Sequence, residues 1–381
     1  MDYRLQFEQT YNQFRTTSLW SDMVATVENS PWHREANVGV HTQMVVEQFM
    51  QRTQDIVWSK DHLVGALACM FHDIGKPASM EHAYSEQRGN YVRFHGHELV
   101  SARLAETYLV EEWADFRDTL EPFDIYSICW SIEHHLPFAI KKPHKRASIK
   151  TVADGLFRED PSVFETMILS DQYGRISDDA EAKLARVHEW LQEFAEWPKK
   201  SPTESTDQPI LLMLIGVSSS GKSTYASSIE DSEDDFVLFS WDRMRLDRYP
   251  MPRSLDVGGV SEKERYQYAF DMSCDDPTFY PSTIDHFNAL LREKRNIVVD
   301  NMNLSEKRRR QFAELAARKG YFVGATVFPA SLPVLQARDA ARGDRGLGAD
   351  VIRDMYMRLT YPSLSEYCHS ITVNDGNLTK E

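Results

Sequence analysis

Apolar residues recur at intervals of three and four positions through the first half of the chain. One such series consists of Leu63, Ala66, Leu67, Met70 and Phe71. This spacing places the side chains on a single face of a helix. Runs of β-branched residues are few in the same region. The pattern therefore predicts an all-α helical bundle for residues 1–197.

The hydrophobic pattern changes after the polar segment EWPKKSPTESTDQP, whose three prolines are typical of a linker. Beyond it, helical segments such as residues 305–319 alternate with the short apolar runs ILLMLIG, FVLFS, NIVVD, FVGATVF and SITV. This alternation indicates an α/β domain with a parallel sheet. The predicted organisation is thus a helical domain over residues 1–197, a linker over 198–209 and an α/β domain over 210–381.

The length of 381 residues and the 42% hydrophobic content agree with two globular domains. No apolar run approaches the roughly 20 residues that cross a bilayer, so no membrane association is expected. The amino-terminal stretch MDYRLQFEQTYNQF carries charges where a signal peptide needs an apolar core. Four widely spaced cysteines form no CxxC pair, which argues against a zinc ribbon or a disulfide framework. These features favour a cytoplasmic protein.

The formal net charge of −15 argues against a protein that coats nucleic acid without specificity. Basic residues are nevertheless concentrated in EKRRRQ, residues 306–311, and in ARDAARGDRG, residues 337–346. The first cluster is best interpreted as a solvated helix face. A nucleic-acid end remains a suitable substrate if it binds where positive charge is locally concentrated.

The segment GVSSSGKST has the spacing of a P-loop, with a predicted strand before it and a predicted helix after it. Its glycines let backbone N–H groups surround phosphates, and Lys222 reaches the β- and γ-phosphates. Ser223 is the expected ligand of Mg²⁺. The predicted ATP-binding positions of this segment are Gly216, Ser220, Gly221, Lys222, Ser223 and Thr224. The chain has no NKxD motif for guanine, which disfavours a GTPase.

Two features favour phosphoryl transfer to a hydroxyl. In SWDRMR, after the second predicted strand, Asp242 can accept a proton from a hydroxyl and Arg245 can bind a phosphate. The same spacing also suits a local surface ion pair. In QARDAARGDRG, Arg338 and Arg342 share a predicted helix face beside a Gly-rich stretch. Mobile arginines there can stabilise charge on the transferred group, and otherwise they are simply exposed.

Histidines and aspartates in the first half form a set that suits a hydrolytic transition metal. The candidate ligands are His41, His72, Asp73, His97, His135 and Asp171. His41 shares an apolar stripe with Val38 and Val45, and an ionisable group on such a stripe is costly unless something binds it. Helical spacing favours His135 over His134, whereas His95 competes with His97. A single histidine of this kind is more often a core residue, but several on apolar faces favour a metal site.

The second half resembles the 5′-hydroxyl polynucleotide kinases of T-even phages and their bacterial relatives. The likeness runs from the P-loop through SWDRMR and VVDNMNLSEKRR into ARDAARGDRGLGADVIRDMY. By this resemblance Lys222 and Ser223 bind ATP and Mg²⁺, and Asp242 is the general base. Arg245 would contact the acceptor's phosphate, with Arg338 and Arg342 on the ATP phosphates. Asp300 or Asn301 would occupy the family's remaining acidic position.

The first half resembles the HD superfamily of metal-dependent phosphohydrolases. The motifs are HDIGKP and RFHGHELVSA, which are especially similar to the HD domains attached to tRNA nucleotidyltransferases. The resemblance implies that His41, His72, Asp73 and Asp171 hold one metal and that His97 and His135 complete a second site. Mn²⁺, Ni²⁺ or Co²⁺ are the expected ions. Lys76 would contact a substrate phosphate.

Together the two halves resemble the bifunctional end-healing enzymes called HD-Pnk. This resemblance implies ATP-dependent phosphorylation of 5′-hydroxyl ends and removal of 2′,3′-cyclic phosphate, 2′-phosphate or 3′-phosphate from RNA or DNA ends, with an RNA ligase as a possible later partner. One alternative is a nucleoside or other small-molecule kinase fused to a nucleotide phosphohydrolase. Another is a regulatory protein that uses the P-loop as an ATP switch and the first half as a nucleotide sensor.

Overall fold

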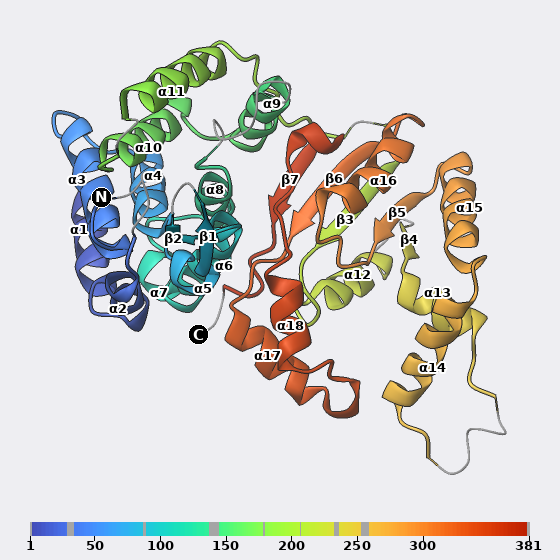
Figure 1. Cartoon of the computed structure of the whole chain (residues 1–381). Coiled ribbons are helices and arrows are strands. Elements are labelled where there is room, and N and C mark those ends of the chain that lie inside the picture. The colour runs from blue at the N-terminus through green and yellow to red at the C-terminus, as the bar shows by residue number, and fades with distance from the viewer. Residues whose placement is uncertain are drawn as a thin grey trace. The chain divides into compact units, whose positions relative to one another are not determined.

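The computed structural model describes residues 2–28, 34–86, 89–136, 145–177, 180–205, 207–231, 236–252 and 259–378. The chain forms two compact units, residues 1–201 and 202–381. In Figure 1 the first unit runs from blue to green and the second from green to red. Each unit buries its own set of large apolar side chains, as expected for a domain with its own core.

Helices dominate the first unit. They are α1 Tyr3–Phe14, α2 Ser18–Ala25, α3 Val38–Arg52, α4 Lys60–Phe71, α5 Lys76–Ser79, α6 His97–Glu111, α7 Trp113–Phe116, α8 Pro122–Glu133, α9 Lys145–Gly155, α10 Pro161–Tyr173 and α11 Ala180–Ala195. Helix α4 packs against α1, α3, α8 and α10. Its sequence LVGALACMF is apolar on every side and wholly buried, as expected for a central helix. The end of α4 therefore lies deep in the bundle.

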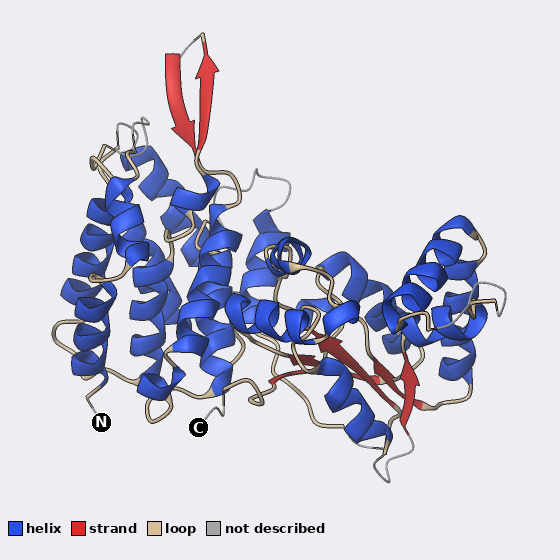
Figure 2. Ribbon diagram, turned by 90° about the horizontal axis from the view of Figure 1, so that it is seen from below, coloured by secondary structure: helices blue, strands red, loops and turns tan. Residues whose placement is uncertain are grey.

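A β-hairpin interrupts the helices between α5 and α6. Strands β1 Glu81–Ser85 and β2 Gly89–Arg93 pair antiparallel, with Ala83 opposite Tyr91. Figure 2 shows the hairpin projecting beyond the helices of its unit. The all-α interpretation did not include it, because its sequences EHAYS and GNYVR are mostly polar and give no strong strand signal. The helical class is confirmed with this one addition.

The second unit is an α/β domain with a five-stranded sheet. Its strands are β3 Ile210–Ile215, β4 Phe236–Phe239, β5 Asn296–Val299, β6 Phe322–Val327 and β7 Ser370–Val373. They lie in the order β4-β5-β3-β6-β7, and every neighbouring pair is parallel. These strands coincide with the five apolar runs of the sequence, so the predicted fold class is confirmed. Since parallel strands end at one edge of a sheet, the segments that follow them meet there.

Helices alternate with these strands along the chain. They are α12 Lys222–Glu230, α13 Trp241–Arg248, α14 Glu262–Asp275, α15 Phe279–Arg292, α16 Glu306–Ala317, α17 Leu332–Ala341 and α18 Ala349–Tyr356, with the 3₁₀ turns η3 Gly343–Arg345 and η4 Leu364–Glu366. Helix α12 packs on β3 and β4, and α16 packs on β3 and β6. Strand β6 is buried along its whole length, which explains its continuous apolar sequence.

The basic cluster EKRRRQ lies at the start of α16 and is only partly a solvated face. Arg309 is fully buried and pairs with both carboxylate oxygens of Glu366, at 2.7 and 2.8 Å. Arg308 lies over the ring of Trp241, 4.6 Å from its centre. The helical pattern could not reveal either partner, because both are distant along the chain. No helix of the described residues has the length and apolar character of a membrane span.

Candidate functional site

Six candidate ligands converge at one end of α4 in the helical unit. They are His41 of α3, His72 and Asp73 at the end of α4, His97 at the start of α6, His135 just after α8, and Asp171 of α10. All six are buried, with exposed fractions of 8% or less. Burying several ionisable groups together is unfavourable unless each has a partner or shares a cation.

Backbone carbonyls fix the orientation of all four imidazoles. The Nδ1 atoms lie 3.1 Å from Gly174 O for His41, 2.8 Å from Cys69 O for His72, 2.7 Å from Phe94 O for His97 and 2.8 Å from Ile132 O for His135. A carbonyl oxygen only accepts, so each Nδ1 donates a proton. In the neutral ring the Nε2 atom then carries a lone pair, which is the arrangement seen in metal-binding histidines.

Two of these lone pairs face each other. His41 Nε2 and His72 Nε2 are 3.3 Å apart. Asp73 Oδ2 lies 3.1 Å from His72 Nε2, and Asp171 Oδ1 lies 3.2 Å from His41 Nε2. Metal–ligand bonds of about 2.1 Å place neighbouring ligand atoms roughly 3.0–3.4 Å apart, so these distances fit a single ion. Without a shared cation or proton, the arrangement would be repulsive.

A second group uses the other oxygen of Asp73. Asp73 Oδ1 lies 3.2 Å from His97 Nε2 and 3.9 Å from His135 Nε2. Apart from these imidazoles, no donor in the described part of the chain reaches Asp73 Oδ1, and the same holds for Asp171 Oδ1 beside His41. Two trios, His41–His72–Asp73 and Asp73–His97–His135, each have the spacing of a metal site. Asp73 would therefore offer one carboxylate oxygen to each of two ions.

The charge states suit cation binding. Burial alone would raise the pKa of Asp73, but His72 and Lys76 hold it well below its ordinary value. Burial also opposes ionisation of Asp171, whereas Arg175 and His41 lower its pKa well below normal. Burial, together with His72 and His97, lowers the pKa of His135 to about 3. Carboxylates are thus anionic and His135 is neutral near neutrality.

Glycine explains how the HDIGKP segment fits against α6. A Cβ atom on Gly75 would lie 2.5 Å from the backbone N of Ser101 and 2.6 Å from the backbone O of His97. The Gly75 N–H donates to Ser101 Oγ at 2.9 Å. Only glycine lets this backbone approach so closely, and the contact joins the segment after Asp73 to the first turn of α6.

Three charged residues lie beside the cluster, and only Lys76 was predicted from the sequence. Lys76 was expected to contact a substrate phosphate, but its Nζ is buried against Asp73 Oδ2 at 2.8 Å and Glu28 Oε1 at 2.6 Å. Arg175 binds Asp171 Oδ2, which leaves Oδ1 directed at His41. Sequence analysis missed Glu28 and Arg175. The spacing of Arg175, four residues after Asp171, was the available signal.

The structure separates the competing histidines. His134 stacks on Trp130 with ring centres 4.0 Å apart, and His95 is exposed, so neither lies in the cluster. The reasoning that favoured His135 was wrong in one respect, because α8 ends at Glu133 and helical spacing does not extend to it. Three residues after His97, Val100 is only half-buried, and Ser101 faces inward instead.

In the α/β unit, a cavity of about 1630 Å³ opens at the carboxyl edge of the sheet. Segments after β3, β4, β5, β6 and β7 all line it. The predicted ATP-binding residues Ser220, Gly221, Lys222, Ser223 and Thr224 are among its lining residues. Gly216 lies just behind them, where a Cβ atom would approach Ser220 Oγ to 2.7 Å. The cavity is large enough for a nucleotide and part of a second substrate.

The P-loop backbone has left-handed residues at Ser219 and Gly221, with φ of 70° and 98°. Lys222 begins α12, and its Nζ donates to Val217 O at 2.7 Å. Burial lowers the pKa of Lys222 to about 8, although Asp300 favours the charged form. Asp300 and Asn301 both line the cavity, and Asn301 Oδ1 also accepts a hydrogen bond from the Trp241 backbone N–H. Asp300 is therefore an acidic group of this cavity that favours the charged form of Lys222.

Asp242 and Arg245 form an ion pair, but not a simple surface one. Arg245 is buried and contacts Asp242 Oδ1 at 2.8 Å, Ser273 Oγ at 3.1 Å and Tyr280 Oη at 3.2 Å. The Tyr266 hydroxyl also donates to Asp242 Oδ1, at 2.9 Å. No described residue donates to Oδ2, and the Asp242 side chain is 62% exposed in the cavity. One carboxylate oxygen is held and the other faces the site.

Both predicted arginines after β6 reach the P-loop. Arg342 Nη1 donates to Ser218 Oγ at 3.3 Å, and Arg338 Nη1 donates to Ser219 O at 3.4 Å. Asn377 joins the two regions, because its Oδ1 accepts from Arg338 at 2.6 Å and its Nδ2 donates to Ser220 O at 3.1 Å. Sequence analysis missed Asn377 and Tyr266, which carry no motif and act through distant partners.

Comparison with known families agrees with this geometry. Residues 40–159 match the HD domain, and residues 211–362 match an AAA domain, a P-loop family. No curated protein matches the chain. A solved structure, the Deinococcus radiodurans tunicamycin resistance protein, is 18% identical over 43% of this chain and 86% of its own, with a TM-score of 0.28. Because the TM-score is this low, the likeness supports no statement about function. The two family matches support phosphohydrolase and kinase activities on one chain.

Proposed function

We propose that the protein repairs nucleic-acid ends, with RNA as its main substrate. The α/β unit phosphorylates a 5′-hydroxyl end with ATP, and the helical unit removes a 2′,3′-cyclic phosphate, 2′-phosphate or 3′-phosphate. The observation that carries the proposal is the Asp242 carboxylate in the P-loop cavity: its Oδ1 accepts two hydrogen bonds, and its Oδ2 accepts none from the described residues. An ATP switch needs no such group, whereas transfer to a hydroxyl does.

In the kinase reaction, Asp242 Oδ2 accepts the proton of the attacking 5′-hydroxyl while Arg245 and Tyr266 keep Oδ1 fixed. Lys222 exchanges its contact with Val217 O for the ATP phosphates, and Ser223 would hold Mg²⁺. Arg338 and Arg342 neutralise the charge that spreads over the transferred group. Arg245 is buried and already held by three partners, so it contacts the acceptor's phosphate only if it releases one of them.

In the phosphohydrolase site, His41, His72, Asp73 and Asp171 would hold one divalent ion, and Asp73, His97 and His135 a second. Such a pair supplies a Lewis acid and an activated water for phosphoester hydrolysis. The chain contributes fixed imidazoles, the Asp73 carboxylate that both trios share, and a buried Lys76 that keeps positive charge beside Asp73. Lys76 contacts a substrate phosphate only if it releases Glu28.

The two activities would act on opposite ends of one break. RNA cleavage often leaves a 2′,3′-cyclic phosphate and a 5′-hydroxyl, and neither end is a substrate for a ligase that joins a 5′-phosphate to a 3′-hydroxyl. A ligase of that kind is the partner we expect to act next. We assign the hydrolase to residues 1–197 and the kinase to residues 210–381.

The direct test uses a short RNA with a 5′-hydroxyl and a 2′,3′-cyclic phosphate, incubated with the full chain, ATP, Mg²⁺ and Mn²⁺. We expect both ends to change, which mass spectrometry resolves as a gain of phosphate at one end and a loss at the other. Matched DNA measures the preference for RNA. RNA whose two ends both stay unchanged, with Mn²⁺ and also when Ni²⁺ or Co²⁺ replaces it, would contradict the proposal.

The second candidate function is a small-molecule kinase joined to a nucleotide phosphohydrolase. The same cavity accommodates a nucleoside acceptor, because Asp242 needs only a hydroxyl. Competition decides between them: a free nucleoside that accepts phosphate faster than an oligonucleotide at equal concentration would favour the small-molecule kinase. ATP binding with no acceptor-dependent turnover would favour a switch instead.

A further inference from the structure

The basic run at the start of α16 contains an exposed arginine without an acidic partner. Arg309 pairs with Glu366 at 2.7 Å, and Arg310 pairs with Glu306 at 2.6 Å. Among the described residues, no carboxylate lies within 4 Å of the guanidinium of Arg308. Acidic residues outnumber lysines and arginines in the chain by 58 to 43. An exposed arginine that pairs with none of them is available to an anion from outside the chain.

The indole ring of Trp241 holds Arg308 in place. The guanidinium centre lies 4.6 Å from the ring centre, and Arg308 Nη1 donates to Gln311 Oε1 at 3.1 Å. Trp241 is itself fixed, because its backbone N–H donates to Asn301 Oδ1 at 3.2 Å and its ring packs edge-on against Tyr280. A guanidinium that is already held on an aromatic ring loses less freedom when it binds an anion.

Arg308 and Trp241 line the same cavity as the candidate base Asp242. The strand order β4-β5-β3-β6-β7 puts the segments after β4 and β5 on one side of the P-loop, which follows β3, and the segment after β6 on the other. Asp242 and Arg308 follow β4 and β5, whereas the two arginines that reach the P-loop follow β6. Arg308 therefore lies on the side of Asp242, where the accepting hydroxyl would bind, and not on the side of the arginines expected on ATP.

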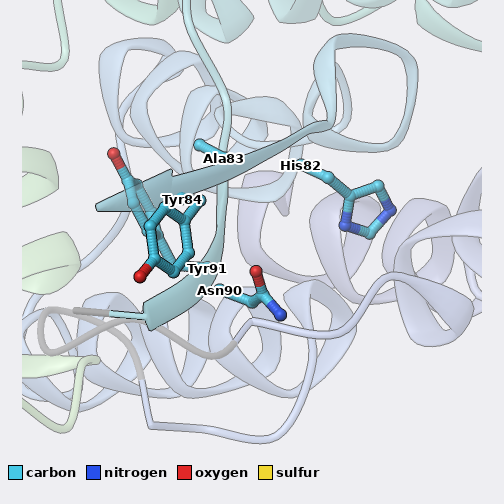
Figure 3. Close-up of a pocket in the computed structure, with 5 residues that line it drawn as sticks. All are labelled: His82, Ala83, Tyr84, Asn90 and Tyr91. Atoms are coloured by element: carbon cyan, nitrogen blue, oxygen red, sulfur yellow. The ribbon is translucent and has the colours of Figure 1, made fainter. Parts of the chain in front are cut away.

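Charge distinguishes this cavity from the hollow on the β1–β2 hairpin. That hollow has a volume of about 430 Å³ and is lined by His82, Ala83, Tyr84, Asn90 and Tyr91. Figure 3 labels these side chains, and none of them is a lysine or an arginine. Since positive charge dominates the affinity of proteins for nucleic-acid backbones, the cavity at the sheet edge suits a polynucleotide better than the hairpin hollow does.

We propose that Arg308, held on Trp241, binds a backbone phosphate next to the 5′ end of a polynucleotide acceptor. This inference rests on the proposed function and names what lets the kinase site prefer a polymer over a nucleoside. Arg245 is buried and must release a partner before it can bind a phosphate, whereas Arg308 is exposed and bonds only to the neutral amide of Gln311 among the described side chains. A guanidinium also matches two phosphate oxygens at once, which gives a strong, directed contact.

The test compares two 2′-O-methyl RNA octamers with a 5′-hydroxyl and a 3′ dye. One has normal linkages, and the other has uncharged methylphosphonates at its first two linkages. Binding is measured with the full chain, ADP and Mg²⁺, so that no phosphate is transferred, and the ratio of the two dissociation constants isolates the charge of these linkages. We expect the unmodified chain to prefer the normal octamer by about 10-fold or more and Arg308→Gln to lose most of that preference, since a hydrogen bond between charged groups contributes on this scale.

Lys307→Gln is the matched control, because it removes the same charge from the same exposed turn of α16 at a residue that is not among those lining the cavity. It should keep the full preference. Salt provides a second readout: in Arg308→Gln the slope of log Kd against log salt for the normal octamer should become shallower by about 0.7, the value for one phosphate of a single strand. An unaltered preference in Arg308→Gln, an equal loss in Lys307→Gln, or no preference by the unmodified chain would each overturn the inference.

Phosphorylation separates this inference from the proposed function. With ATP and an ordinary 5′-hydroxyl RNA octamer, Arg308→Gln should raise KM for the octamer roughly 10-fold and leave KM for ATP unchanged, because the arginine lies on the acceptor's side. Phosphate transfer to the octamer by the unmodified chain, with the same KM in Arg308→Gln, contradicts the inference alone. The expected pattern of binding, without any transfer by the unmodified chain, contradicts the proposed function alone.

Discussion

The two candidate sites differ in how completely the chain prepares them. In the helical unit, His41, His72 and Asp73 are almost fully buried, and backbone carbonyls hold the imidazoles in place. In the α/β unit, Asp242 is largely exposed inside an open cavity, and Lys222 bonds to a carbonyl of its own loop. A buried cluster of ionisable groups requires a cation to balance its charge, whereas groups in an open cavity are stable before their substrates bind. The first site is therefore pre-organised and the second is completed by its ligands.

The strongest test of this comparison is a pair of substitutions, each of which should abolish one activity and leave the other intact. Asp73→Ala removes the only carboxylate that reaches both metal trios of the described cluster, so we expect phosphate release to fall by more than about 10³-fold while 5′ phosphorylation stays within about twofold. Lys222→Ala should do the reverse. End-labelled RNA measures both in one reaction. Loss of both activities in either variant would show that the sites are not independent.

Gly75→Ala probes how strictly the buried site depends on backbone packing. The added Cβ would meet the backbone of Ser101 and His97, so α6 must move and carry His97 away from Asp73. We expect metal affinity to fall roughly 10- to 100-fold, as when a supporting contact of a metal ligand is lost. Metal content of the purified protein gives the measurement. Gly89→Ala, on the hairpin with open space around it, is a control for adding a methyl group, although its positive φ adds local strain.

Much of the fold and part of each site could be predicted from the sequence. The five strands were evident because a parallel sheet buried on both faces needs continuous apolar runs. The P-loop was evident because a phosphate cradle imposes a fixed local spacing. His135 was found for the wrong reason, since it lies past the end of α8 and is placed by the Ile132 carbonyl.

Other features depend on contacts that no local pattern encodes. Asn377 reaches the P-loop over 157 positions of the chain, and Tyr266 reaches Asp242 over 24. Neither residue type has a spacing that marks such a role. The burial of Lys76 between Asp73 and Glu28 was equally hidden, because Glu28 precedes Lys76 by 48 residues and lies in the segment after α2. Long-range polar contacts are thus the part of each site that required the structure.

Tyr266→Phe tests whether the open site is pre-organised at all. The variant loses one hydrogen bond to Asp242 Oδ1 but keeps the one from Arg245. A hydrogen bond to a charged group contributes about 1.5–3 kcal/mol at most, so we expect kcat of the kinase to fall roughly 10-fold with KM for ATP unchanged.

Tyr280→Phe is the matched control, since Tyr280 bonds to Arg245 and not to Asp242. It should lose less activity than Tyr266→Phe. Equal effects of the two substitutions would mean that Tyr266 acts only through packing. Hydrolase activity should be the same in both variants and in the unmodified chain.

The smallest effect concerns protons taken up when ATP fills the open site. Burial lowers the pKa of Lys222 to about 8, so near pH 8 about half of the ligand-free molecules carry a neutral lysine. Bound phosphates favour the charged form and raise this pKa, which makes ATP binding consume about half a proton at pH 8 and much less at pH 7. Affinity should accordingly decline as the pH rises above about 8.

Calorimetry in buffers of different ionisation enthalpy measures this uptake directly. Lys222→Arg is the informative comparison, because a guanidinium stays charged throughout this range and should bind ATP, even if more weakly, without taking up a proton. Uptake that persists in Lys222→Arg would assign the proton to another group. An unmodified chain with no uptake at pH 8 would mean that Lys222 is already fully charged before ATP arrives, and the open site would then resemble the buried one in being prepared in advance.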